Sequence, residues 1–379
     1  MVSETTHPYQ TPYIPPPYPY DLLDELRAVA AERFGAAIDC SIGAPIDPPP
    51  SAVVEALSSS NAERGYPPSI GTLAFRDAAA RWMACIADVH VDPKTQIGAT
   101  VGTKEFVAGA PHYLRMRRPD RDTILYPEVS YPSYEQGAIF SGCRAVAVPV
   151  DDQWRIDLSA IDPADAARAL CLWVNTPGNP AGGIDDLGAA AAFGREYDVT
   201  VLSDECYIEF TWQGAPQSIL QHGTDNVLAL HSLSKRSNLA GGRAGFYAGD
   251  TDLVHYLREV RKHGGFMVPG PVQAAAVAAF DDQDHVAVQR EIYLERLHLG
   301  LDLIRAAGAE VELPGGGFYL WAAAPGGDSW ALARTLAERA GVIVSPSEFY
   351  GRRTDHIRFA AVQPTEDLRT ATARMTGAA

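Results

Sequence analysis

Short apolar runs alternate with alanine-rich stretches of helical period between residues 72 and 270. The apolar runs are rich in β-branched and aromatic residues and end at Gly, Pro or acidic positions, as buried strands do. Helical stretches such as 185–197 lie between them. This alternation predicts an α/β fold with a doubly wound, mainly parallel sheet. The predicted strands span residues 96–102, 122–128, 144–150, 169–175, 199–205, 227–233 and 244–250.

The flanking segments predict a second, smaller α+β domain. A helical pattern begins at Tyr20 and ends at Gly35. A second helix is expected over 51–60, with Ser51 as its N-cap after three prolines. Beyond Pro271 we expect helices at 273–282, 285–308 and 329–341, and strand-like segments at 315–323, 342–349 and 356–362.

These patterns divide the chain into four segments. Residues 1–18 are rich in Pro and Tyr and have no helical or strand period, which predicts an extended arm, although composition fits a floppy tail equally well. Residues 19–49 are expected to form the N-terminal part of the small domain. Residues 50–275 are expected to form the large domain, and 276–379 the rest of the small one.

Composition narrows the choice of partners. The chain has 31 basic and 47 acidic residues among 379, and the net charge of −16 argues against binding to nucleic acid or to anionic membranes. No apolar run approaches the ~20 residues of a membrane helix, and the N-terminus does not resemble a signal peptide. The five widely spaced cysteines suggest neither a disulfide framework nor a metal site. We expect a cytoplasmic protein that acts on small molecules.

The segment 232–246, SLSKRSNLAGGRAGF, carries the most specific chemical signal. Lys235 follows Ser232 and Ser234, and Arg243 comes eight residues later. An amine that attacks an aldehyde, beside hydroxyls and a guanidinium suited to a phosphate, is what a protein needs to hold pyridoxal 5'-phosphate as a Schiff base. A lone lysine is most often a solvated surface charge, and only these neighbours raise the interpretation of Lys235 above that.

Two residues near the end of the strand at 199–205 fit the same cofactor. The carboxylate of Asp204 can pair with a protonated pyridine nitrogen, and Tyr207 can hydrogen-bond the phenolic oxygen of the ring. At an effective dielectric of ~20, a contact ion pair at about 4 Å is worth on the order of 4 kcal/mol before desolvation. Taken singly, Asp204 could be a turn residue and Tyr207 a packed aromatic.

A phosphate cradle and a ring cover have candidates as well. Gly102, Thr103 and Lys104 follow a strand and open a helix, so their backbone N–H groups can bind phosphate, although ordinary helix capping explains the same residues. Tyr131, in the segment PEVSYPSY, is the candidate that stacks on the ring and assists catalysis. Pro132 beside it also fits a simple turn.

Two further residues are candidates for substrate binding. Asn179, within NTPGNP at 175–180 and fixed between two prolines, can donate a hydrogen bond to the phenolic oxygen of the ring and is also a candidate substrate contact. Arg358 lies in the apolar strand pattern HIRFAAV, which would bury its stem and suits bidentate capture of a carboxylate. A common Asn-Pro turn and a structural salt bridge are the alternatives.

Taken together, these motifs resemble the class I/II aminotransferases, which are fold type I pyridoxal phosphate enzymes. The resemblance runs from about Tyr20 to the C-terminus and is greatest to the actinobacterial succinyldiaminopimelate transaminase branch. It implies a homodimer with shared active sites, in which Tyr66 reaches the cofactor phosphate of the neighbouring subunit and Gly43 lies against the substrate carboxylate. The segments that carry it are YPPSIGTLAFRDA, GTKEFVAG, PEVSYPSYEQGA, NTPGNPAGG, SDECYIEF, SLSKRSNLAGGRAGF, RKHGGFMVPGPVQAA and SPSEFYG.

The reaction that the resemblance implies is amino transfer between an amino acid with a polar or acidic distal group and a 2-oxo acid such as 2-oxoglutarate. Lys235 would bind the cofactor and then shuttle the proton at the substrate α-carbon. Ala181 and Gly242 depart from the usual family residues, which leaves open β- or γ-elimination or replacement, for example on S-adenosylmethionine. A non-catalytic sensor module is a third hypothesis, but the first 40 residues do not suggest a DNA-binding domain. The sequence does not select a substrate.

Overall fold

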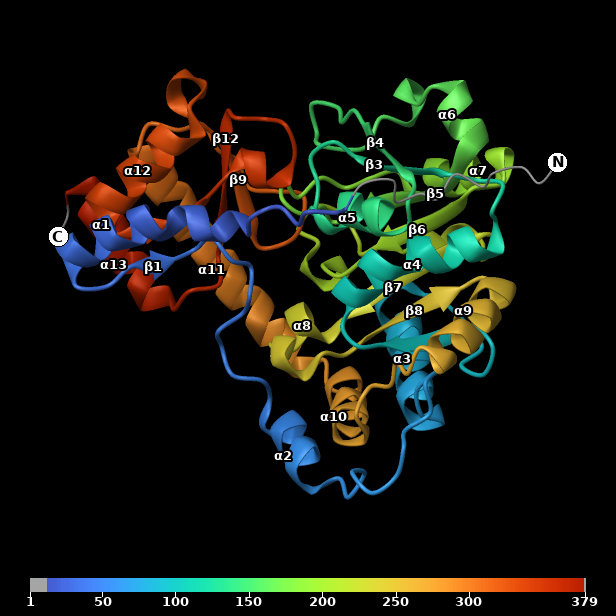
Figure 1. Ribbon diagram of the computed structural model, residues 1–379. Helices are drawn as coiled ribbons and strands as arrows, with labels where there is room; N and C mark the ends of the chain where they lie inside the picture. Colours follow the sequence, from blue (N-terminus) through green and yellow to red (C-terminus); the bar gives the residue numbers. More distant parts are fainter. Residues whose placement is uncertain (1–11, 378–379) are drawn as a thin grey trace.

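The computed structural model describes residues 12–377 and folds into two parts (Figure 1). The large part is built on a seven-stranded sheet with the order β2-β8-β7-β6-β5-β3-β4. Neighbouring strands from β7 to β4 run parallel, while β8 is antiparallel to both β7 and β2. The strands are β2 Ile97–Thr100, β3 Thr123–Pro127, β4 Arg144–Val148, β5 Ala169–Asn175, β6 Thr200–Asp204, β7 Val227–Ser232 and β8 Gly245–Gly249.

Helices cover both faces of this sheet, in keeping with central strands β5, β6 and β7 that are buried along their whole length and are mostly apolar. One face packs against α4 Thr103–Arg117, α5 Ser133–Phe140 and α9 Thr251–His263. The other packs against α3 Leu73–Ala87, α7 Leu187–Tyr197 and α10 Gly270–Asp281. Shorter helices are α2 Ser51–Ser59, α6 Pro163–Arg168, α8 Leu233–Arg236, η2 Leu158–Ala160, η3 Ile208–Phe210, η4 Ile219–His222 and η5 Ala240–Gly242.

The small part joins the two ends of the chain around its own apolar core. An antiparallel sheet has the order β11-β12-β9, and β1 pairs with β10 in parallel. Helix α11 leads from the large part into this one (Figure 1). The elements are η1 Pro19–Leu23, α1 Asp24–Phe34, β1 Ile38–Asp39, α11 Asp284–Ala306, β9 Tyr319–Ala323, η6 Pro325–Gly327, α12 Ser329–Ala340, β10 Val342–Ile343, β11 Ser345–Pro346, η7 Ser347–Tyr350, β12 His356–Ala360 and α13 Thr365–Thr376.

The predicted α/β fold with a mainly parallel sheet is confirmed, and each predicted strand of the large sheet is present. Gly35 ends α1 in the left-handed conformation, as its position predicts. The expectation that Ser51 caps α2 is wrong. Pro50 is the N-cap and Ser51 is the first helical residue. Because the backbone of Pro50 is still extended, the helix begins only at the residue after it.

Residues 12–18 have no regular secondary structure and run along the large part before η1 begins. Residues 1–11 of the predicted arm lie outside the described residues. Between residues 12 and 377, no helix is long and apolar enough to cross a membrane.

Candidate active site

The candidate site forms where the parallel strands of the large sheet end. Strand β6 ends at Asp204, and β7 ends at Ser232, directly before α8. The Ser232 side chain accepts a hydrogen bond from the Ser234 backbone N–H at 3.2 Å and so caps the helix that carries Lys235. Because parallel strands present their carboxyl ends at one edge, Asp204 and Lys235 lie within electrostatic range of each other.

Lys235 lies in the interior between the two parts of the molecule. Its Nζ donates to the carbonyl oxygen of Gly43 from the small part and lies 5.8 Å from the centre of the Phe318 ring. Burial disfavours the charged ammonium and lowers the pKa of Lys235 to about 8. The amine is therefore available as a nucleophile closer to neutral pH than an exposed lysine would be.

Asp204 is a buried carboxylate with hydrogen-bond donors on both oxygens. Oδ2 accepts from the Tyr134 hydroxyl at 2.9 Å, and Oδ1 accepts from the Cys206 backbone N–H at 3.2 Å. Burial raises the pKa of Asp204, while Cys206, Tyr134 and the nearby Lys235 act in the opposite direction. A carboxylate held dry in this way is a strong partner for a cationic ring nitrogen.

Gly102 and Arg243 form the rim on the other side of Lys235. Gly102 has φ 73° and precedes α4, which begins at Thr103. A Cβ at Gly102 would lie 2.0 Å from Arg243 Nη2, so only glycine lets the guanidinium lie across this backbone. Arg243 Nη1 donates to the Ala240 carbonyl at 2.8 Å. A guanidinium beside a helix N-terminus is suited to a phosphate.

Arg358 occupies the small-domain side of the site. It is 2% exposed and lies between the Tyr319 and Tyr350 rings, with centroids 4.3 and 4.5 Å from its Cζ. Nη1 donates to Asn179 Oδ1 at 2.8 Å, and Nη2 donates to the Ser41 carbonyl at 2.5 Å. Among residues 12–377 no carboxylate pairs with this guanidinium, so the predicted alternative of a structural salt bridge is wrong.

The three predicted tyrosines lie in different surroundings. The Tyr207 hydroxyl is buried and shares a hydrogen bond of 2.8 Å with the Tyr319 hydroxyl. Tyr131 is half-buried, with Lys104 Nζ 5.9 Å from its ring centre. Tyr66 is 96% exposed and lies apart from the others, on the loop between α2 and α3.

The structure adds residues that the sequence patterns did not indicate. Tyr134, Tyr319, Tyr350 and Ser41 contact Asp204, Tyr207 or Arg358 directly. Tyr134 lies in the same motif as Tyr131, three residues further on, and that spacing could have indicated it. The others come from segments far away in the chain, where no local signal points to the site.

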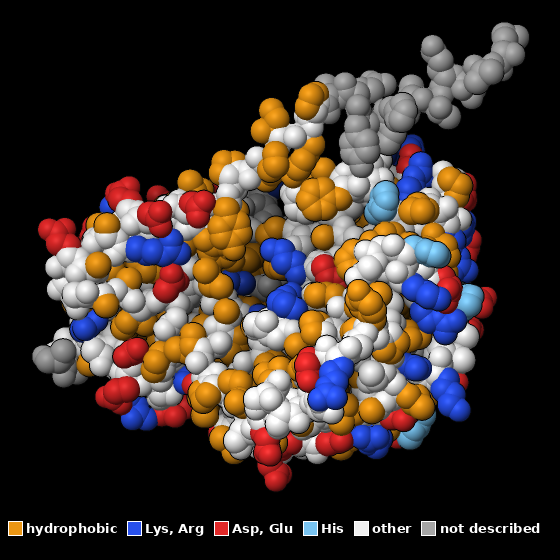
Figure 2. Space-filling view, turned by 60° about the horizontal axis from the view of Figure 1, so that its bottom comes forward, with side chains coloured by type: hydrophobic (Ala, Val, Ile, Leu, Met, Phe, Trp, Pro, Cys, Tyr) orange, Lys and Arg blue, Asp and Glu red, His pale blue; other side chains and the backbone are white. Residues whose placement is uncertain are grey.

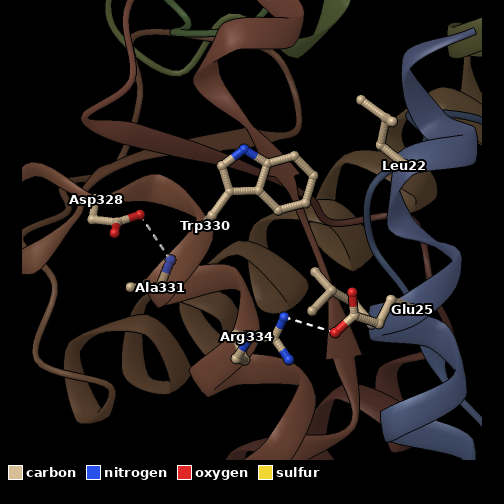
Figure 3. A pocket seen from close by; sticks show the side chains of 7 residues that line it. Leu22, Glu25, Asp328, Trp330, Ala331 and Arg334 are labelled. Carbon is tan, nitrogen blue, oxygen red and sulfur yellow. Dashed lines mark hydrogen bonds and ion pairs between the residues drawn. The ribbon is translucent and has the colours of Figure 1, made fainter. Parts of the chain in front are cut away.

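Two cavities differ in their relation to this arrangement. One of about 350 Å³ lies between α1 and α12, where Arg334 Nη2 pairs with Glu25 Oε1 at 2.9 Å and the Trp330 side chain forms a wall (Figure 3). It contains none of the predicted site residues. A smaller cavity of about 10 Å³, room for a single water, lies beside Asn179.

The chain belongs to the class I and II aminotransferases, since the profile of the family described as "Aminotransferase class I and II" matches residues 37–375. The curated relatives include the 4-dedimethylamino-4-oxo-anhydrotetracycline transaminase OxyQ of Streptomyces rimosus, 36% identical over 95% of this chain and 99% of that protein. An LL-diaminopimelate aminotransferase of Aquifex aeolicus is 32% identical over 95% of this chain and 96% of its own length.

Solved structures show the same similarity. Substrate-bound BacF from Bacillus subtilis superposes with a TM-score of 0.87 at 28% identity and covers 97% of both chains. A probable N-succinyldiaminopimelate aminotransferase from Thermus thermophilus gives a TM-score of 0.85 at 30% identity, covering 96% of this chain and all of that one, 100%. The resemblance inferred from the motifs is thus confirmed at the level of the family.

Members of this family use pyridoxal 5'-phosphate, and the chain is a pyridoxal phosphate-dependent aminotransferase. The residues present fit that cofactor. A partly buried amine of lowered pKa interacts electrostatically with a buried carboxylate, and Arg243 with the start of α4 offers a place for a phosphate. When bound, the cofactor supplies an electron sink that makes the α-hydrogen of an amino acid acidic.

Proposed function

We propose that the enzyme moves an amino group between an amino acid with a polar or acidic distal group and a 2-oxo acid, with glutamate and 2-oxoglutarate as one pair. Cofactor attachment and proton transfer at the substrate α-carbon are assigned to Lys235. Asp204 holds the ring nitrogen protonated, and Tyr131 covers the ring. Because Lys235 Nζ already contacts the Gly43 carbonyl, an amine bound there lies at the border of the two domains.

The other proposed roles concern binding. Arg243 and the start of α4 bind the phosphate together with Tyr66 of a second subunit in a homodimer. This assignment to phosphate is supported by the close approach of the Arg243 guanidinium to the Gly102 backbone at the start of α4. Asn179 and Tyr207 hydrogen-bond the phenolic oxygen of the ring. The remaining phosphate ligands are Gly102, Thr103, Lys104, Ser232 and Ser234.

The proposal that the substrate binds through its α-carboxylate rests on Arg358. Burying a guanidinium without a carboxylate is costly, and such a group gains most from an anionic ligand. Its Nε atom has no hydrogen-bond partner, and Nη1 rests on the side chain of Asn179, which is itself a proposed site residue. The α-carboxylate of an amino acid supplies the missing negative charge and, with Gly43 close by, places the α-carbon near Lys235.

Substituting Arg358 tests this proposal. Arg358→Ala should raise the KM for amino acid and 2-oxo acid by about 30-fold or more, because removing one member of a buried charge pair costs ~2 to 5 kcal/mol. Arg358→Lys is the control that keeps the charge but loses the planar fork, and it should be intermediate. Products are read by mass spectrometry after incubation with pooled amino acids and a 2-oxo acid panel. An unchanged KM in Arg358→Ala would rule out the assigned role.

The similarity to OxyQ supports a second candidate for the acceptor, the 4-oxo group of an anhydrotetracycline such as its name describes. The named relatives are transaminases, which does not favour the alternative of elimination or replacement. That alternative was motivated by Ala181 and Gly242. For Gly242 the structure gives a local steric reason, since a Cβ there would lie 2.8 Å from Leu239 Cγ. Net amine transfer to a 2-oxo acid with no release of a leaving group would identify transamination, whereas release of a leaving group would identify elimination or replacement.

A further inference from the structure

The two parts of the molecule meet around a central hollow that has basic side chains on its walls (Figure 2). Arg358 comes from the small part and Asn179 from the large part, and their hydrogen bond of 2.8 Å crosses this boundary. The proposed function assigns substrate binding to both residues. Their spacing therefore depends on the contacts that fix the small part against the large one close to the site.

The segment 150–156, here called the edge loop, makes such a contact. It follows β4, the strand at one edge of the large sheet. Asp151 Oδ1 accepts from the Arg155 backbone N–H at 2.9 Å, and the Trp154 backbone N–H donates to the Asp151 carbonyl at 2.9 Å. In this tight turn Trp154 has φ 63°, a strained conformation for a residue with a bulky side chain. Such strain persists only where the surroundings hold the residue in place.

The Trp154 side chain packs against the small part. Its ring lies edge-on to Trp321 of β9 and His356 of β12, with ring centroids 5.9 and 5.0 Å away. The Arg353 guanidinium lies 5.3 Å from the centre of the same ring. Trp154 is also one of the apolar side chains that pack against the core of the small part. A residue of the large part thus contributes to the core of the small one, and this packing holds the strained turn.

The strands that Trp154 contacts also carry Arg358. Arg358 pairs with Trp321 across β9 and β12 and lies two residues after His356, so the three side chains share one face of the sheet. The Trp321 and His356 rings are stacked, with centroids 5.3 Å apart and planes at 14°. The Trp321 ring also lies 6.0 Å from that of Tyr350, which in turn lies against the guanidinium. Packed rings thus connect Trp154 with Arg358.

On its other side the edge loop lies against the segment that carries Asn179. A Cβ at Gly183 would lie 2.6 Å from the Trp154 carbonyl oxygen, so only glycine allows this approach. The Ile156 backbone N–H donates to Oδ1 of Asp185 at 2.9 Å. Trp154 and Asn179 also line the same cavity of about 10 Å³. The edge loop therefore contacts the supports of both proposed substrate-binding residues.

We infer that Trp154 is a positioning residue, which holds Arg358 and Asn179 at the spacing that binds a substrate carboxylate. It acts through the shared face of β9 and β12 and through the segment after Asn179. The inference rests on the proposed function, in which Arg358 binds this carboxylate. Truncating the indole should leave Arg358 charged but less well placed. Carboxylate affinity should then fall, while the residues proposed to bind the cofactor, which lie in the large part, are undisturbed.

Binding of butyrate, an unreactive monocarboxylate, tests the inference. A saturation-transfer NMR titration of the enzyme with its cofactor bound gives the dissociation constant. Trp154→Ala should weaken butyrate about tenfold, whereas Trp154→Phe keeps a ring at this position and should weaken it less than about twofold. Trp330→Ala is the matched control, because its indole lines the pocket between α1 and α12 instead of the boundary (Figure 3), and it should leave butyrate binding unaffected. Cofactor affinity should be equal in all of these variants.

A double-mutant cycle separates positioning from a general loosening of the fold. In an Arg358→Lys background, Trp154→Ala should weaken butyrate by less than about twofold further, because a flexible ammonium group gains little from a fixed geometry. Equal weakening in both backgrounds would show that Trp154 acts independently of Arg358. Unchanged butyrate affinity in Trp154→Ala, or a matching loss of cofactor affinity, would also overturn the inference. If Arg358→Lys alone leaves butyrate binding unchanged, the proposed function fails, independently of the result at Trp154.

Discussion

Three charged groups, on the buried residues Asp204 and Arg358 and on the partly buried Lys235, dominate the site at the scale of single residues. None forms a close salt bridge with another within residues 12–377, and each is held by neutral donors or acceptors instead. Buried charges in this state are expensive, and the cost falls when complementary charges arrive. In the proposed function a cationic ring nitrogen would pair with Asp204 and a substrate carboxylate with Arg358, while Lys235 would react as a neutral amine with the aldehyde.

The lowered pKa of Lys235 predicts how the cofactor-free protein takes up its cofactor. Only the neutral amine attacks an aldehyde, and with a pKa of about 8 it is the minor form at pH 7 and the major form at pH 9. The rate of attachment should therefore rise about tenfold per pH unit below 8 and level off above 9. Stopped-flow absorbance of added cofactor measures this rate. Lys235→Ala should show no fast phase, and a flat profile between pH 7 and 9 would contradict the lowered pKa.

At the scale of elements, the junction of β2, α4 and η5 forms the proposed phosphate site. Gly102 lies between β2 and α4 with φ 73° and ψ 155°, a conformation open essentially to glycine alone. Arg243 follows η5 with φ 52° and lies over Gly102. The missing Cβ thus serves the backbone turn and the close approach of the guanidinium together.

Gly102→Ala should disturb both the backbone turn at this residue and the position of the Arg243 guanidinium. The backbone strain costs about 1 to 3 kcal/mol, and the displaced guanidinium should weaken cofactor binding by tenfold or more. Gly241→Ala is the matched control, because Gly241 lies in η5 with no atom within 4 Å of a built Cβ and no positive φ. Thermal unfolding and cofactor titration of both variants provide the measurements. Equal cofactor affinity in the two variants would argue against Arg243 and α4 as the phosphate site.

How far the sequence predicts the fold also differs between elements. Apart from the largely exposed edge strand β4, the strands of the large sheet are buried along their whole length, so each is a mostly apolar run with a sharp end. The residues at those ends are predicted with the strand. The strand-like segment 342–349 forms β10, β11 and η7, because β10 pairs with β1 in one sheet and β11 pairs with β12 in another, so the chain changes sheets at Val344. The contacts of Tyr319, Tyr350 and Ser41 with the site depend on docking of the small part onto the large one, which no local period encodes.

For the whole molecule, the cleft draws its residues from both parts. Asp204 at the end of β6 and Lys235 in α8 come from the large part, while Gly43 and Arg358 come from the small part. One predicted ligand, Tyr66, does not fit this single-chain account, because its ring is 96% exposed and lies apart from the cleft. An exposed tyrosine of this size gains from burial against a second surface. The proposed homodimer supplies such a surface and places the tyrosine in the other subunit's site.

Mixed dimers distinguish a site completed by Tyr66 of the other subunit from a site formed by one subunit alone. A Lys235→Ala subunit is inactive, and a Tyr66→Phe subunit should bind cofactor about tenfold more weakly because it loses a charge-assisted hydrogen bond to phosphate. In a hybrid of the two, the site that keeps Lys235 receives Tyr66 from the Lys235→Ala partner. With differently tagged subunits purified as hybrids, half of the sites should then regain wild-type cofactor affinity. If Tyr66 acts within its own subunit, the hybrid retains only the weak affinity of Tyr66→Phe, and the shared-site dimer is excluded.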